Sequence, residues 1–281
     1  MSTYACLRGV PQLRTALEYL SPSHPALYAV GYSLTELLRQ EGLEPDGVIG
    51  YSLGEYVALT VAGSLSFDDA FSLVMRQANI VERRCRGGML SVLASRSLFE
   101  RRRDIFGGVT LAAVNYGNNF VISGETERLS RIQTILDAES VIAVRLPVQY
   151  GFHSELMEPA RNEIVASAAN VAIGTATIPV YSAAYARRVD DGNVTRFGAY
   201  VWDVLRNPIR FQDLIQSAFE SPDNYYWVDL SPSGSLTNFL RHGFGDQYRT
   251  APAINQFGNN AATLNKLRLE LAGLSLARRS A

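Results

Sequence analysis

Residues 46–56 constrain this chain more than any other stretch, and they read DGVIGYSLGEY. A short apolar run leads into GYSLG at residues 50–54, and a helical pattern follows. This order is the G-x-S-x-G nucleophile elbow, in which a strand turns sharply into a helix and presents the serine hydroxyl. The segment predicts Ser52 as a nucleophile, with an ordinary tight turn as the alternative. The backbone N–H of Leu53, at the helix N-terminus, then points to the position where an oxyanion would form.

A serine nucleophile needs a base, and the chain has three histidines. His24 precedes a proline in front of a helix, and His242 lies near a helix end, where a positive charge suits the dipole. His153 follows a predicted strand and precedes a predicted helix, in a loop of the kind that displays catalytic side chains. We therefore expect His153 to be the base. Because only the neutral imidazole accepts a proton, activity should rise with pH through roughly 6–7.

Composition bounds the class of protein. The 281 residues, 47% of them apolar, suffice for one large domain or a domain with an inserted smaller one. A net charge of −1 gives no electrostatic reason to bind nucleic acid or an anionic membrane. Cys6 and Cys85 make no disulfide framework, no signal peptide opens the chain, and no apolar run approaches a membrane span, so we expect a cytoplasmic protein. Without a Gly-rich phosphate loop or a Cys/His cluster, we expect no metal and no cofactor.

The hydrophobic pattern alternates between helix and strand periods. Outside the middle of the chain it predicts helices over residues 25–40, 53–62, 66–84, 154–169, 211–219 and 264–274, with another after 231–234, and strands over 48–49, 178–182 and 225–230. In the middle it predicts strands over residues 89–94, 109–115, 119–123 and 141–148, and helices over 97–105 and 127–136. That βαββαβ order suggests a ferredoxin-like module. We therefore expect residues 87–148 to form a subdomain inserted into a catalytic domain made of 1–86 and 149–281.

Five motifs, in the same order, resemble those of malonyl-CoA:acyl carrier protein transacylases and polyketide synthase acyltransferase domains. They are GYSLGEY at 50–56, VNY with VISG at 114–124, YGFHS at 150–154, NPIRF at 207–211 and DLSPSG at 229–234. The resemblance implies an α/β-hydrolase-like core with a parallel sheet and an inserted ferredoxin-like α+β subdomain. It also implies a Ser–His dyad that takes an acyl group from a thioester. Backbone carbonyls orient the histidine in this family, and the loop at 231–234 is a candidate source of one.

One position departs from the transferase pattern. Those enzymes carry an arginine in the helix after the elbow, because a guanidinium binds the malonyl carboxylate with two hydrogen bonds. A count without gaps places Gln77 there, and Arg76 lies about 100° around the helix, on a different face. Glutamine suits a neutral acyl chain. A slip of one residue, which would restore Arg76 to the site, is the alternative.

Gln77 together with residues 150–153 resembles the discrete acyl hydrolases of trans-acyltransferase polyketide synthases, which cleave stalled acyl groups from acyl carrier proteins. The resemblance implies a substrate presented on a 4′-phosphopantetheine arm, with acyl-CoA as a second acyl source. Gln77, Phe152, Tyr150 and Asn115 would bind the substrate. Two alternatives stay open: a malonyl or other acyltransferase with the same dyad, and a non-catalytic scaffold that docks carrier proteins.

The start of the chain also departs from the family. Its members open with a strand and a GQGSQ loop, whose glutamine N–H completes the oxyanion hole. Residues 1–12 read MSTYACLRGVPQ and contain no such loop. From this sequence we expect the oxyanion hole to be one donor short.

Overall fold

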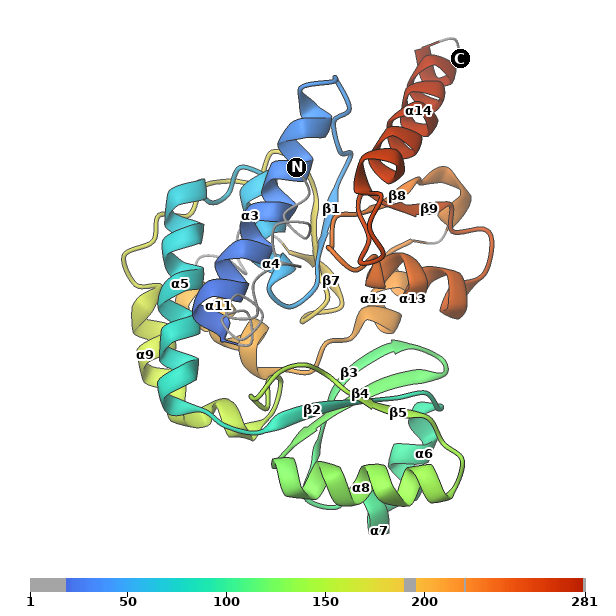
Figure 1. Cartoon of the computed structure of the whole chain (residues 1–281). Helices are drawn as coiled ribbons and strands as arrows, with labels where there is room; N and C mark the ends of the chain where they lie inside the picture. Colours follow the sequence, from blue (N-terminus) through green and yellow to red (C-terminus); the bar gives the residue numbers. More distant parts are fainter. Residues whose placement is uncertain (1–18, 190–195, 220, 280–281) are drawn as a thin grey trace. The chain divides into compact units, whose positions relative to one another are not determined.

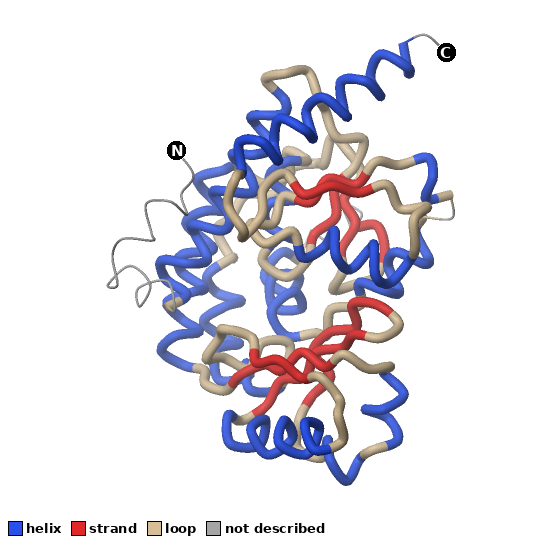
Figure 2. Tube along the Cα trace, turned by 45° about the vertical axis from the view of Figure 1, so that its right-hand side comes forward, coloured by secondary structure: helices blue, strands red, loops and turns tan. Residues whose placement is uncertain are grey.

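The computed structural model describes residues 19–189, 196–219 and 221–279 (Figure 1). Helices and strands are interspersed along the chain, as the sequence predicts for the α/β class (Figure 2). The chain divides into two compact units, one of residues 47–220 and one of residues 1–46 with 221–281. The segment that lacks a GQGSQ loop lies outside the described residues.

The elbow belongs to the three-stranded sheet of the first unit. Strand β1 (Val48–Gly50) pairs in parallel with β6 (Val180–Ser182), which places Gly50 beside Ser182. Strand β7 (Arg187–Val189), which the sequence analysis did not predict, pairs antiparallel with β6. A parallel pair needs a long crossover, whereas the short turn between β6 and β7 permits only a hairpin.

Helices of the same unit carry the chain around this sheet. They are α4 (Gly54–Val61), α5 (Phe67–Arg84), the 3₁₀ helix η1 (Glu155–Ala160), α9 (Arg161–Ser167), α11 (Phe197–Arg206) and α12 (Phe211–Ala218). Ser66 caps α5, because its hydroxyl accepts a hydrogen bond from the N–H of Asp69 at 3.1 Å. The single helix predicted for residues 154–169 is divided into η1 and α9. Pro159 lies at that division, and proline lacks the N–H that an α-helix interior requires.

The middle of the chain forms a four-stranded antiparallel sheet with helices packed on it (Figure 1). Its elements are β2 (Gly88–Val92), α6 (Arg96–Arg101), α7 (Arg103–Phe106), β3 (Thr110–Tyr116), β4 (Asn119–Gly124), α8 (Thr126–Ala138) and β5 (Ala143–Arg145). The strand order is β3-β4-β2-β5. Helix α6 ends at Arg101, and the backbone of Arg102 leaves the helical region, so the single helix predicted for 97–105 is broken. The guanidinium of Arg102 binds Asp104 and Glu139. The division of the chain at residues 87 and 148 stays a prediction.

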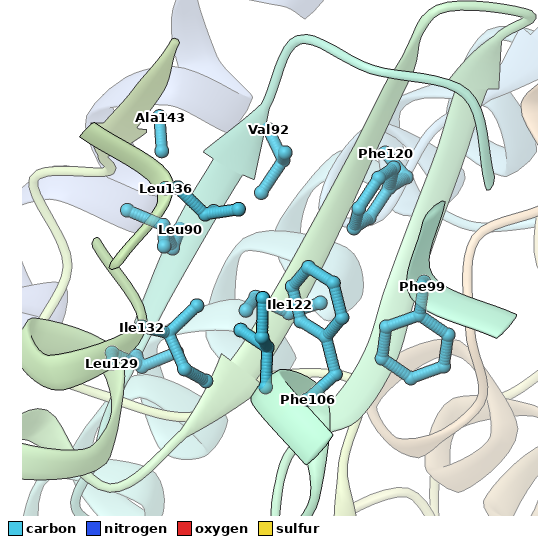
Figure 3. Packing of buried hydrophobic residues seen from close by; sticks show 11 residues of the cluster. Leu90, Val92, Phe99, Phe106, Phe120, Ile122, Leu129, Ile132, Leu136 and Ala143 are labelled. Carbon is cyan, nitrogen blue, oxygen red and sulfur yellow. The ribbon is translucent and has the colours of Figure 1, made fainter. Parts of the chain in front are cut away.

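One apolar cluster holds the helices of this module on its sheet (Figure 3). Leu90 and Ile122 extend from the sheet, and Leu129 and Ile132 extend from α8 toward them. The rings of Phe99, Phe106 and Phe120 pack together with centroids 5.3–6.0 Å apart. The opposite face of the sheet carries the polar side chains of Ser91 and Ser123, which belong to the site described below.

The second unit contains α3 (Leu20–Arg39), η2 (Pro222–Asn224), β8 (Trp227–Asp229), α13 (Ser235–Phe244), β9 (Thr250–Pro252) and α14 (Asn260–Arg279). Strands β8 and β9 pair in parallel. The carboxylate of Asp229 accepts hydrogen bonds from the N–H groups of Ser231 and Thr237, and so shapes the turn that leads into α13. Within the described ranges, every helix is too short or too polar to cross a membrane.

Candidate active site

The nucleophile elbow adopts a strained backbone at its centre. Ser52 lies between β1 and α4 with φ of +52°, in the left-handed region that side chains other than glycine rarely adopt. A Cβ at Gly50 would lie 2.5 Å from Oε2 and 2.6 Å from Cα of Glu55, so only glycine fits there. A Cβ at Gly54 would meet nothing within 4 Å. The close approach that excludes a side chain is therefore at Gly50 and not at both glycines.

The structure brings Ser52 and His153 together, although 101 positions separate them in the chain. The Ser52 hydroxyl lies 3.0 Å from Nε2 of His153, and Nδ1 of His153 lies 2.9 Å from the carbonyl oxygen of Asn207. A carbonyl oxygen only accepts hydrogen bonds, so Nδ1 carries the proton. Nε2 therefore presents its lone pair to the hydroxyl, as a general base requires.

The C-terminus of α11 holds His153 from two sides. The backbone N–H of His153 donates to the Leu205 carbonyl at 3.0 Å, and its ring donates to the Asn207 carbonyl. Helix α11 stops here because Asn207 precedes Pro208, and a residue before proline avoids the helical region. Carbonyls of a last helical turn lack intrahelical partners and form the negative end of the dipole, which favours a protonated imidazole. The sequence analysis names the loop at 231–234 as a candidate source of the orienting carbonyl, whereas the carbonyl that the His153 ring contacts belongs to Asn207.

Burial changes the basicity of His153. Only 2% of the residue is exposed, and this desolvation lowers the pKa of His153 to about 4, with the Asn207 hydrogen bond opposing the shift. The limb expected near pH 6–7 assumed an ordinary imidazole. In the folded protein the ring is neutral throughout that range and ready to accept a proton.

The predicted oxyanion donor, the N–H of Leu53, donates no hydrogen bond within the described residues. The N–H groups of Gly54 and Glu55 donate to the carbonyls of Tyr51 and Ser52, both at 2.9 Å. The Leu53 N–H has no acceptor among the residues that the structure describes. It stands at the N-cap of α4, where the helix dipole favours negative charge.

Gln77 and Arg76 point to different environments. Gln77 is buried on α5, where its Oε1 accepts a hydrogen bond from the Tyr56 hydroxyl at 2.7 Å. Its Nε2 is buried and finds no partner in the described part of the chain. Arg76 is exposed and donates to the carbonyl of Ser167 at 3.2 Å. The buried position that contacts Tyr56 of α4 is thus occupied by an uncharged amide, the side chain of Gln77.

Asn115 links the elbow to the four-stranded sheet. Its Oδ1 accepts from the Tyr51 hydroxyl at 2.8 Å, and its Nδ2 donates to Asn119 at 2.7 Å. Asn119 in turn donates to the hydroxyl of Ser91 at 3.0 Å. Both Oδ1 and Nδ2 of Asn115 therefore have hydrogen-bond partners within the protein. This series of hydrogen bonds begins at Tyr51, the residue before Ser52.

Tyr150 and Phe152 form the apolar side of the same region. Both residues are buried, and their rings meet edge to face with centroids 6.1 Å apart. The Phe152 ring lies 6.4 Å from the imidazole of His153, and its carbonyl accepts a hydrogen bond from Ser123. In the described residues, no group of three or more His, Cys, Asp or Glu side chains is placed to hold a metal ion.

The sequence analysis did not predict three parts of this arrangement. It took residues 207–211 only as a motif match, although the Asn-Pro step after an apolar helical repeat could have indicated a free carbonyl. It assigned no role to Glu55, which is buried directly beneath the elbow. Residues 197–206 have a helical apolar period, but the sequence analysis predicts no helix there. The residues of this period that are buried include Phe197, Tyr200, Val201 and Val204.

Comparison with known proteins agrees with this geometry. Residues 14–277 match the family of acyl transferase domains, and the chain belongs to that family. It is 40% identical over 220 residues to the polyketide biosynthesis acyltransferase homolog BaeD of Bacillus velezensis, and 33% identical over 222 residues to the homolog PksD of Bacillus subtilis. Each match covers 78% of this chain and 66% of the relative, so the chain spans just under two thirds of those proteins.

A solved structure shows the same fold. The loading acyltransferase of the avermectin modular polyketide synthase superposes with a TM-score of 0.83 at 26% identity, over 91% of this chain and 81% of that one. The α/β acyltransferase fold expected from the motifs is therefore confirmed.

Proposed function

We propose that this chain is a serine acyl hydrolase that cleaves acyl groups from acyl carrier protein thioesters in polyketide biosynthesis. Membership of the acyl transferase family and the names of the bacterial relatives support the pathway. The Ser52–His153 pair supports the reaction class, because a hydroxyl within hydrogen-bond reach of a neutral, oriented imidazole is the arrangement of an activated nucleophile.

The reaction proceeds through an acyl-enzyme. Ser52 Oγ attacks the thioester carbonyl while His153 Nε2 accepts the hydroxyl proton, and the Leu53 N–H donates to the oxyanion. The carbon–sulfur bond then breaks, and the imidazolium returns its proton to the thiolate of the phosphopantetheine arm. A water molecule gives a proton to His153 and attacks the ester. The acid leaves, and the proton on His153 restores the Ser52 hydroxyl.

The observation that favours a neutral acyl group is the buried Gln77. A malonyl carboxylate next to this amide would be desolvated without a cation, which costs more than the amide hydrogen bond returns. Arg76, which could neutralise it, is exposed and bonded to Ser167. Acyl carrier protein is the proposed donor, with acyl-CoA as a second source.

One experiment separates this function from the two alternatives. The protein is incubated with acetyl-loaded acyl carrier protein, with and without a second, unloaded carrier protein. The masses of all species are then measured by mass spectrometry. Free acetate in both reactions supports the hydrolase, whereas transfer to the second carrier identifies an acyltransferase. A docking scaffold would do neither and would not react with a serine-directed phosphonate. Ser52→Ala is the control, and it should lose acylation by about 10⁴-fold or more.

A further inference from the structure

A fully buried carboxyl group lies under the elbow. Glu55 is 0% exposed in the first turn of α4, three residues after Ser52. Its Oε1 accepts from the Ser182 hydroxyl at 2.7 Å and from the N–H of Ala184 at 3.3 Å. Its Oε2 accepts from the Tyr200 hydroxyl at 2.7 Å. Both carboxyl oxygens of Glu55 therefore have at least one hydrogen-bond donor.

The partners of Glu55 belong to the elements that carry both reacting groups. Ser182 ends β6 beside Gly50, the last residue of the strand that enters the elbow. Tyr200 lies in α11, the helix whose carbonyls at Leu205 and Asn207 hold His153. Contacts thus run in a closed circuit from Ser52 along α4 to Glu55, across to Tyr200, along α11 to His153, and back to Ser52.

An apolar contact between α4 and α11 would have avoided the cost of burying a carboxyl group. That cost is visible in the pKa of Glu55. Burial raises it to about 7, and the hydrogen bonds from Tyr200, Ser182 and Ala184 act in the opposite direction by lowering it. Apolar contacts have no preferred direction, so two helices joined by them can slide. A short hydrogen bond with one geometry fixes their relative position, and acyl transfer is sensitive to shifts of about 1 Å.

We propose that Glu55 and Tyr200 form a positioning pair, which ties α4 to α11 and so holds Ser52 at reacting distance from His153. The proposal rests on the proposed function, in which Ser52 is the nucleophile. Neither residue touches the substrate; each acts through the element that carries a reacting group.

The test compares two tyrosines bonded to carboxylates. Tyr200→Phe removes the hydroxyl that joins α11 to α4. Tyr185→Phe is the matched control, because the Tyr185 hydroxyl donates to Asp203 of α11 at 2.8 Å and makes no bond to α4. The readout is acylation of Ser52 by a chromogenic ester, followed to saturation by stopped flow. We expect the limiting acylation rate of Tyr200→Phe to fall about tenfold or more with half-saturation unchanged, and that of Tyr185→Phe to stay within about twofold.

Two further variants protect the test against misfolding. Glu55→Leu loses all three hydrogen bonds, whereas Glu55→Gln keeps Oε1 for Ser182 and can donate from Nε2 to Tyr200. Glu55→Gln should therefore recover most of the rate that Glu55→Leu loses. If Tyr200→Phe does not fold, Glu55→Gln with Tyr200→Phe breaks the same link without an unpaired charge and should show the same fall. Equal limiting rates for Tyr200→Phe, or the double variant, and Tyr185→Phe would overturn the positioning pair. Absence of any acylation in the wild type would overturn the proposed function as well.

Discussion

The carbonyl oxygen of Asn207 lies 2.9 Å from Nδ1 of His153, where a Ser-His-Asp triad places a carboxylate. Both groups select the same imidazole tautomer. They differ in charge, and a carbonyl does little to stabilise an imidazolium against burial. Desolvation of the buried ring lowers the pKa of His153 to about 4, and the hydrogen bond to Asn207 opposes this shift without the full negative charge that a carboxylate would supply.

The pH dependence of the reaction should report this low pKa. We expect kcat/KM for a neutral ester to be flat from about pH 6 to about pH 8 and to fall only as His153 becomes protonated near pH 4, because the charged ring cannot accept a proton. Initial rates across that range test it, with His242→Ala as a control that should leave the profile unchanged. A limb near pH 6.5 would contradict the structural assignment and restore the expectation made for an exposed imidazole.

The end of α11 should matter for catalysis through Pro208. This proline is exposed, so Pro208→Ala removes little packing, but it frees Asn207 from the extended backbone that points its carbonyl at His153. We expect the acylation rate to fall by about tenfold while the melting temperature changes little. Pro222→Ala, at the start of η2, is a matched control that should leave the rate unaltered. Equal rates for both variants would show that Pro208 is not needed to orient the carbonyl.

Acyl preference should follow Gln77. In a competition between acetyl- and malonyl-loaded carrier protein, the wild type should favour acetyl by about tenfold or more, since about 1.4 kcal/mol corresponds to a factor of ten. Gln77→Arg should move the preference toward malonyl by supplying a guanidinium fork. Arg76→Ala should leave the ratio nearly unchanged, because Arg76 is bonded to Ser167 at the surface. Loss of malonyl turnover in Arg76→Ala alone would favour the transferase.

Glu55 and His153 should give opposite slopes of stability against pH. Burial raises the pKa of Glu55 to about 7, so its contribution is greatest below the unfolded pKa and is lost as pH rises to about 7. Burial lowers the pKa of His153 to about 4, so the folded state is destabilised as pH falls below the unfolded value of about 6.5. Between about pH 5 and about pH 7 each effect amounts to about 2 kcal/mol, and the two nearly cancel.

Single substitutions should reveal the pH dependence of stability that each of the two groups contributes, since the two contributions nearly cancel in the wild type. Urea unfolding of Glu55→Gln should show stability rising by about 2 kcal/mol from pH 5 to pH 7 relative to the wild type, and His153→Gln should show it falling by about as much. Other titrating groups affect all three proteins alike, so the comparison isolates the two side chains. Parallel curves for the wild type and both variants would mean that neither pKa is shifted on folding.

Local signals in the sequence were sufficient for much of the fold. The elbow was recognised because a strand, a tight turn and a helix follow one another within residues 46–56. Most of the helices were predicted because helical periodicity acts within a few residues. Breaks at Arg102 and Pro159 were missed, since the apolar period continues through both positions.

The sequence by itself determined the family and predicted Ser52 as the nucleophile and His153 as its base, because each of these rests on short motifs whose residues are neighbours in the chain. Tertiary structure alone decided what surrounds them. His153 meets the Asn207 carbonyl across 54 positions, and Glu55 meets Tyr200 across 145. The burial that sets the pKa values of His153 and Glu55 likewise arises only when distant segments pack together. No local spacing encodes such contacts, since they depend on which helix ends and which strand edges meet after folding.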